Sequence, residues 1–189
     1  MIVEVERRFI AGLQLRKSAD KTTLVGLAVP YNVKSDDMGF RETIAKGAFS
    51  KHLRSDPDVR ALIEHDNSKI IGRTRAGTLS LIEDDNGVSV SIDPPNNQTG
   101  NDVVESVRRG DLSAMSFGFR TLKDVWTTVD GGPIRTVNEA ELFDVSIVAT
   151  PAYPNTSIAV RSLEAWRQEN TKMTETKPET KPETKPETM

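Results

Sequence analysis

Ser116 is the first candidate in this sequence for a residue that takes part in a chemical reaction. Its hydroxyl stands between Met115 and Phe117 in an apolar run, so its neighbours favour burial while it needs a hydrogen-bond partner. Gly118 leaves room for another backbone or a substrate to approach. Such a serine is either a hydrogen-bonded core residue or a nucleophile that a nearby base activates. Spacing alone leaves both interpretations open.

The sequence offers two histidines as candidate general bases. His65 ends the apolar run 59–64 and precedes Asp66 and Asn67. A histidine where a strand opens into a polar loop is held by rigid backbone and is still accessible to a substrate. The same position also suits a half-buried histidine that caps a strand end. His52 lies off the apolar face of a predicted helix, and we expect it to be a solvated or capping residue.

Two carboxylates that could orient such a base belong to a further apolar run, residues 141–149. Glu141 begins this run and Asp144 interrupts it. A buried carboxylate should be paired, because an isolated buried charge is very costly. Asp144 could therefore orient a histidine or pair with an arginine. No spacing of His, Asp and Glu resembles a metal site, and no glycine-containing stretch has the phosphate-loop pattern, so neither a metal nor a cofactor is expected.

The elements that must position these side chains are mainly short strands. The clearest is a hairpin over residues 79–92, in which apolar and polar residues alternate on both sides of a turn. Asn86 and Gly87 tolerate the positive φ angles that a tight reversal demands. The other predicted strands, with alternating or continuous apolar sequence, cover residues 9–16, 23–29, 112–119 and 141–149.

A few helices are predicted between the strands. The first follows Thr43 as its N-cap, and its apolar residues recur every four positions as far as Leu53. The second covers residues 103–109 and ends at Gly110, and a last helix covers about 161–168. Many short strands with two or three helices predict a β-rich α+β fold, a closed or partly closed β-barrel flanked by a few helices.

Composition limits the class of protein and its partners. The chain has 189 residues and a net charge of −3, which argues against DNA binding through the overall field. Cysteine is absent, so neither disulfides nor a thiolate nucleophile can form, which fits a reducing cytoplasm. No apolar run approaches the roughly 20 residues of a membrane span, and the first residues lack the order of a signal peptide. We expect a soluble, intracellular protein.

The C-terminal segment differs sharply in composition from the rest. The sequence Lys-Pro-Glu-Thr repeats from Lys177, from Lys181 and from Lys185. Proline at every fourth position prevents a helix, and nothing in the segment can form a core. The sequence therefore predicts one folded domain over residues 1–168 and a disordered tail over 169–189. The tail is interpreted as a solubilising tether, with a specific docking motif as the alternative.

Taken together, several segments resemble the prohead maturation proteases of tailed bacteriophages, a serine protease family related to the herpesvirus capsid protease assemblin. The resemblance extends from about Thr23 to Val160, and no single segment carries it. The order of the segments makes it specific: GLAVPY at 26–31, ETI and GAF within 42–49, ALIEHD at 61–66, RGDLSAMSFGF at 109–119, and ELFDVSIV at 141–148 followed by PA at 151–152.

The resemblance implies roles for particular residues. The catalytic histidine of the family falls on His65 and its serine on Ser116. Ser113 is the rival serine, but the Met-Ser-Phe-Gly-Phe core of the family pattern is centred on Ser116. The third member falls on Asp144 or Glu141, and Asp144 is favoured because it directly precedes the segment that matches the strand of the third residue. The oxyanion-binding amides would come from the loop at 150–153.

The resemblance also implies a fold, an activity and a setting. The fold would be an assemblin-like β-barrel flanked by helices. The protein would be a serine endopeptidase that cleaves capsid scaffold, or the scaffold-like segment of the major capsid protein, and also itself. It would act inside the procapsid in the host cytoplasm, with the capsid and scaffold proteins as partners, and it could form a homo-oligomer. Nucleic acid and membrane are not expected partners.

Two other kinds of function remain compatible with the residues. One is a non-catalytic, protease-like scaffold or capsid-assembly module. The other is an unrelated β-rich ligand-binding domain in which Ser116 is only a core hydroxyl. An intact set of Ser116, His65 and Asp144 favours the enzyme over both.

Overall fold

The computed structural model describes residues 5–18, 21–130, 132–149 and 163–168. Its strands are β1 (Glu6–Ala11), β2 (Gln14–Ser18), β3 (Lys21–Pro30), β4 (Arg41–Ile44), β5 (Arg60–Ile63), β6 (Asp66–Arg73), β7 (Leu79–Glu83), β8 (Gly87–Ile92), β9 (Ala114–Val129) and β10 (Gly132–Val148). Its helices are α1 (Ser50–Leu53), the 3₁₀ turn η1 (Thr74–Ala76), α2 (Gln98–Arg109) and a short helix at 163–168.

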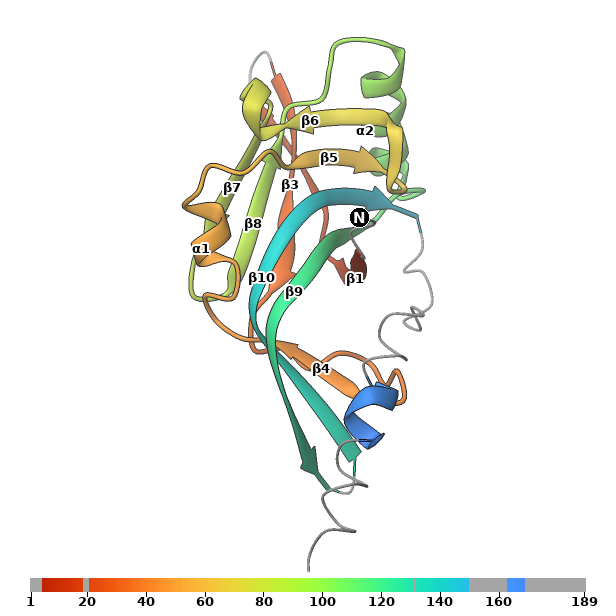
Figure 1. Cartoon of the computed structure of the whole chain (residues 1–189). Coiled ribbons are helices and arrows are strands. Elements are labelled where there is room, and N and C mark those ends of the chain that lie inside the picture. The colour runs from red at the N-terminus through yellow and green to blue at the C-terminus, as the bar shows by residue number, and fades with distance from the viewer. Residues whose placement is uncertain (1–4, 19–20, 131, 150–162, 169–189) are drawn as a thin grey trace, which may run out of the picture.

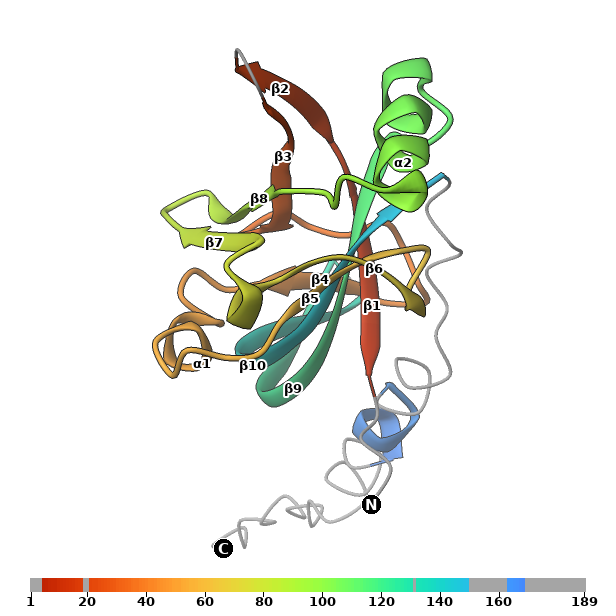
Figure 2. The same cartoon turned by 90° about the horizontal axis from the view of Figure 1, so that it is seen from above.

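The strands pair into two sheets (Figure 1 and Figure 2). The larger sheet has the order β1-β9-β10-β5-β6, and β4 also pairs with β10; the smaller sheet has the order β2-β3-β8-β7. β9 and β10 form a long antiparallel hairpin, which runs down the molecule in Figure 1. One half of this hairpin lies between β1 and β5, and the half nearer the turn adjoins β4. The central strands of the larger sheet are therefore β9 and β10.

One hydrophobic core lies between the two sheets. It takes Leu24 and Val90 from the smaller sheet and Phe117 and Ile147 from the larger one, all almost completely buried. Phe117 and Phe119 pack against the ring of Phe49 in edge-to-face geometry, with ring centroids 6.3 and 6.1 Å apart. The predicted β-rich α+β fold is confirmed. Among the described strands, the pairing gives two packed sheets and no continuous ring of hydrogen-bonded strands.

Most strand predictions are confirmed, with one difference near the N-terminus. The hairpin at 79–92 is formed by β7 and β8. The strand predicted over 9–16 is broken at Gly12, whose φ of +121° lets the chain leave the larger sheet after β1 and enter the smaller one as β2. The runs at 112–119 and 141–149 belong to longer strands, because each continues into the β9–β10 hairpin.

Of the three predicted helices, two are present and one is wrong. The last, predicted over about 161–168, is helical over the described residues 163–168. The second helix is present as α2, which begins after the N-cap Asn97 and ends at Gly110. The helix predicted after Thr43 is wrong, because Thr43 lies in β4 and pairs in parallel with Thr136. Within the predicted helix, only its last turn, α1 (Ser50–Leu53), is helical. The four-residue periodicity comes from a strand, a turn and one helical turn in succession, so pairing with β10 overrides the local pattern.

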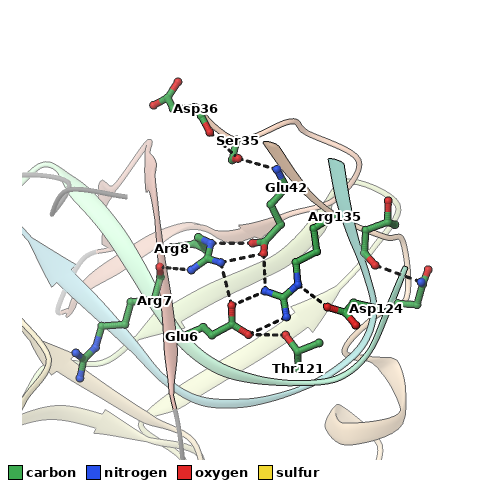
Figure 3. A network of polar contacts seen from close by, with 11 residues as sticks. Glu6, Arg7, Arg8, Ser35, Asp36, Glu42, Thr121, Asp124 and Arg135 are labelled. Atoms are coloured by element: carbon green, nitrogen blue, oxygen red, sulfur yellow. Dashed lines mark hydrogen bonds and ion pairs between the residues drawn. The ribbon is translucent and has the colours of Figure 1, made fainter. Parts of the chain in front are cut away.

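A cluster of buried charges holds β1 against the centre of the larger sheet (Figure 3). Arg8 Nε donates to Glu42 Oε1 at 2.7 Å, and Arg135 Nη1 donates to Glu6 Oε2 at 2.6 Å and to Glu42 Oε2 at 2.9 Å. All four side chains are buried. Burial by itself would raise the pKa of Glu6, but the hydrogen bond from Arg135 and the charges of Arg135 and Arg8 outweigh it, so that this pKa lies below its usual value.

This charge cluster, made of Glu6, Arg8, Glu42 and Arg135, also determines the register of β1. Glu6 and Arg8 are two residues apart and share the inner face of the strand. A slip of one residue would turn both charges outward and abolish their pairing. In the observed register Phe9 lies directly across from Ser116 on β9. The buried charges thus fix which side chain of β1 adjoins the candidate nucleophile.

Candidate active site

His65 lies in a tight turn between β5 and β6. Ile63 pairs with Asp66 across the turn, and the two residues between them, Glu64 and His65, have φ angles of +53° and +56°. Residues other than glycine tolerate this left-handed region at a cost of about 1–2 kcal/mol each. The turn is held to β10 because Glu64 N–H donates to Ile147 O at 3.0 Å and Glu64 Oε1 accepts from Ala149 N–H at 2.7 Å. The strained backbone aims the imidazole across the sheet.

Ser116 lies near the start of β9, on the face of the larger sheet opposite the core. Met115 and Phe117 point into the core, so Ser116 and Gly118 belong to the other face. Ser116 pairs with Ser146 of β10 on one side and with Phe9 of β1 on the other, and its side chain is fully buried. The alternation of β9 therefore explains how a hydroxyl can stand between two core residues.

Asp144 reaches the same face through an irregularity in β10. The register between β9 and β10 shifts between Leu142 and Asp144, so that Asp144 pairs with Gly118. The carboxylate fills the space above Gly118, where a Cβ atom would lie 2.3 Å from Asp144 Oδ2. β10 also runs parallel to β5, with Ile147 opposite Ile63 at the end of β5 that leads into the His65 turn. Three separate elements thus converge on one point.

The three side chains form a continuous hydrogen-bonded chain. His65 Nε2 lies 2.5 Å from Ser116 Oγ, and His65 Nδ1 lies 2.6 Å from Asp144 Oδ1. The side chains of His65 and Asp144 are only 10% and 9% exposed. Because an ionised carboxylate can only accept, Nδ1 carries the proton and Nε2 is free to accept from the serine hydroxyl. This arrangement can activate Ser116 as a nucleophile.

The other candidate residues, Glu141, Ser113 and His52, have no hydrogen bond to His65 among the contacts described. Glu141 forms an ion pair with Arg120 of β9. Ser113 is exposed and precedes β9. His52, expected to be solvated or capping, is half-buried, with Nε2 2.9 Å from the backbone oxygen of Leu142. The predicted oxyanion loop at 150–153 and the predicted tail at 169–189 lie outside the described residues.

Two residues that the sequence analysis did not assign to the site adjoin this hydrogen-bonded chain. Ser146 Oγ lies 2.9 Å from Asp144 Oδ1 and 3.1 Å from His65 Nδ1. Gly118 leaves the space that the Asp144 carboxylate occupies. A signal for Ser146 existed, since residues two apart on a strand share a face and Ser146 follows Asp144 by two.

Gly118→Ala should therefore damage the site without removing any functional group. The new Cβ would clash with Asp144 Oδ2, and a shift of the carboxylate by about 1 Å can cost on the order of 10²-fold in rate. The measurement is the rate at which a fluorophosphonate labels Ser116. Gly132→Ala is the matched control in β10, because the nearest atom to its Cβ is Val129 O at 3.8 Å. Equal labelling of both variants and wild type would show that Asp144 is not held tightly at Gly118.

Within the part of the chain that the structure describes, no group of three or more His, Asp or Glu side chains is arranged to hold a metal ion. None of the helices described is long and apolar enough to cross a membrane.

Comparisons with known proteins agree with the resemblance noted in the sequence. Residues 12–173 match the family described as caudovirus prohead serine protease. Among solved structures, the capsid assembly protease of bacteriophage T4 aligns with a TM-score of 0.49 and 12% sequence identity, over 76% of this chain and 98% of that chain. No curated protein matches the chain significantly.

Proposed function

The chain belongs to the caudovirus prohead serine protease family, and from this premise we propose that it is a serine endopeptidase that acts in prohead maturation through Ser116, His65 and Asp144. The observation that supports this proposal most directly is the hydrogen-bonded chain from Ser116 Oγ through the His65 ring to Asp144 Oδ1. These are the three residues that the family resemblance favoured as nucleophile, base and acid, with Asp144 preferred over Glu141.

The roles follow from the geometry of that chain. Ser116 Oγ attacks the scissile carbonyl carbon while His65 Nε2 takes the hydroxyl proton. The imidazolium then gives this proton to the amine as the C–N bond breaks, which leaves an acyl group on Ser116. Water attacks the acyl group with His65 again as the base, and Ser116 is regenerated. Asp144 keeps the proton on Nδ1 and stabilises the imidazolium.

The proposed substrates are proteins of the prohead. We infer cleavage of the capsid scaffold, or of the scaffold-like segment of the major capsid protein, and of the protease itself. The reaction would take place inside the procapsid in the host cytoplasm. Enclosure with the substrate raises its effective concentration, so weak binding of each cleavage site is sufficient.

Co-expression with the cognate capsid and scaffold proteins, followed by intact-mass measurement of every chain, tests this function. Wild type should yield discrete cleavage products, and Ser116→Ala should yield none, because the variant lacks the hydroxyl that lies within hydrogen-bonding distance of His65 Nε2, the nitrogen that can accept a proton. Ser113→Ala is the matched control and should retain most of the cleavage, since Ser113 is exposed and precedes β9.

The opposite pattern, an active Ser116→Ala and an inactive Ser113→Ala, would overturn the assignment of the nucleophile. Intact substrates with wild type, together with no fluorophosphonate labelling of Ser116, would point to the non-catalytic assembly module instead.

A further inference from the structure

Ser146 is a fully buried hydroxyl that the proposed mechanism does not yet use. It lies on β10 directly across from Ser116 and two residues after Asp144, so all three side chains belong to one face of the larger sheet. Its Oγ atom is 2.9 Å from Asp144 Oδ1 and 3.1 Å from His65 Nδ1. Ser146 thus contacts the acid and the base but has no hydrogen bond to Ser116 among the contacts described.

The hydrogen atoms available determine the direction of these contacts. A serine hydroxyl has one proton to donate, and the carboxylate oxygen is the acceptor next to it. Ser146 therefore donates to Asp144 Oδ1, and the lone pairs of its oxygen face the Nδ1–H of His65. That N–H also points at Asp144 Oδ1, 2.6 Å away. Asp144 Oδ1 consequently receives two donors, and Ser146, Asp144 and His65 form a closed triangle.

The second carboxylate oxygen is constrained in a different way. Asp144 Oδ2 lies so close to the backbone of Gly118 that a Cβ atom there would be 2.3 Å away. A carboxylate with a single donor could rotate about its Cβ–Cγ bond and lose alignment with the imidazole. Here one oxygen is held by two donors, and the other is confined by the neighbouring strand.

We propose that Ser146 is a positioning residue, which holds Asp144 Oδ1 in line with His65 Nδ1 and so keeps Nε2 aimed at Ser116. This inference rests on the proposed function and adds a fourth residue to its machinery. Ser146 acts through Asp144 and does not touch the substrate. Its removal should therefore slow the chemical step and leave the binding of a substrate or probe unchanged.

The test uses the rate at which a fluorophosphonate labels Ser116, measured over a range of probe concentrations in the full-length protein. Ser146→Ala should lower the limiting rate by roughly 10- to 100-fold, because a hydrogen bond to a charged group is lost. The probe concentration at half-maximal rate should stay constant. Ser146→Cys is close in size but has a weak donor, so it should remain slow. Ser91→Ala, a half-buried serine of β8 in the smaller sheet, is the control and should match wild type.

A double-mutant cycle separates positioning from packing. If Ser146 acts through the carboxylate, adding Ser146→Ala to Asp144→Ala should change the remaining rate by less than about twofold, since the two residues act as a unit. Wild-type labelling rates in Ser146→Ala or Ser146→Cys would overturn the inference and leave the proposed function standing. So would an equal fall in labelling rate when Ser146→Ala is added to wild type and to Asp144→Ala. Absence of labelling in wild type itself would overturn both.

Discussion

Asp144→Asn should lower the rate of cleavage, and of fluorophosphonate labelling, by up to about 10⁴-fold, because an amide in this place favours the wrong histidine tautomer. Asn has the size of Asp, so the space above Gly118 stays filled and the melting temperature should change little. Both rates are measured on purified protein, with a peptide that covers a cleavage site found in the co-expression experiment. Circular dichroism of the same samples verifies that the fold is retained.

Glu141→Gln is the matched control for this substitution, because it removes the other candidate acid, which lies on the same strand. Glu141 pairs with Arg120 and has no hydrogen bond to His65 among the contacts described. The variant should therefore keep most of its activity. A crippled Glu141→Gln beside a fully active Asp144→Asn would move the acid to Glu141. Full activity in both would mean that Ser116 and His65 work as a dyad.

Arg135→Met should destabilise the protein by about 3–5 kcal/mol, since removal of one partner from a buried ion pair leaves an uncompensated charge. Arg135 is 3% exposed and donates to both Glu6 and Glu42. Methionine can fill much of the volume of the arginine stem but cannot pair with either carboxylate. Denaturant unfolding, monitored by circular dichroism, gives the free energy of unfolding for wild type and the variant.

An exposed ion pair provides the control for this second prediction. Arg73 donates to Asp58 at 2.7 and 2.6 Å in a similar two-bond geometry, but its side chain is 45% exposed. Arg73→Met should change the free energy of unfolding far less, because water solvates the remaining carboxylate. Hydrogen exchange should also show the largest loss of protection in β1 of Arg135→Met. Equal, small effects of both substitutions would mean that the charge cluster does not hold β1.

The fold places its functional side chains by combining strain with rigid support. His65 stands in a left-handed turn that is held by backbone contacts of Glu64 to Ile147 of β10 and side-chain contacts of Glu64 to Ala149, the residue after β10. Ser116 stands on a strand with neighbours on both sides, one of which is held by buried charges. The strained turn and the buried charges are thus both stabilised by contacts with strands that also form the core.

Local pattern was enough to predict the parts of this protein that depend on neighbouring residues in the chain. The 79–92 hairpin follows from its alternation and from Gly87, and the end of α2 follows from Gly110. Ser116 was singled out because a hydroxyl between apolar neighbours needs a partner, and His65 because it stands where a predicted strand opens into a polar loop. The resemblance to a known family then joined the two residues into one hypothesis about their chemistry.

The choice between the two acids shows what local pattern could not supply. On a regular strand, Glu141 and Asp144 would point to opposite faces, because they are three positions apart. The register shift after Leu142 places Asp144 opposite Gly118 and leaves Glu141 opposite Arg120. Since Gly118 and Arg120 share a face of β9, both acids lie on the same side of the sheet. Their different partners, and not their orientation, distinguish them.

The sequence by itself therefore determined the β-rich class, the α2 helix and the residues able to do chemistry, since these follow from side-chain type and short-range periodicity. Only the tertiary structure decided which residues meet. Thr43 lies in a strand instead of capping a helix because β4 pairs in parallel with β10. Glu6 and Arg135 became a buried pair, although 129 positions separate them, because β1 and β10 flank the same strand. Such contacts depend on the pairing of distant segments, which no local pattern encodes.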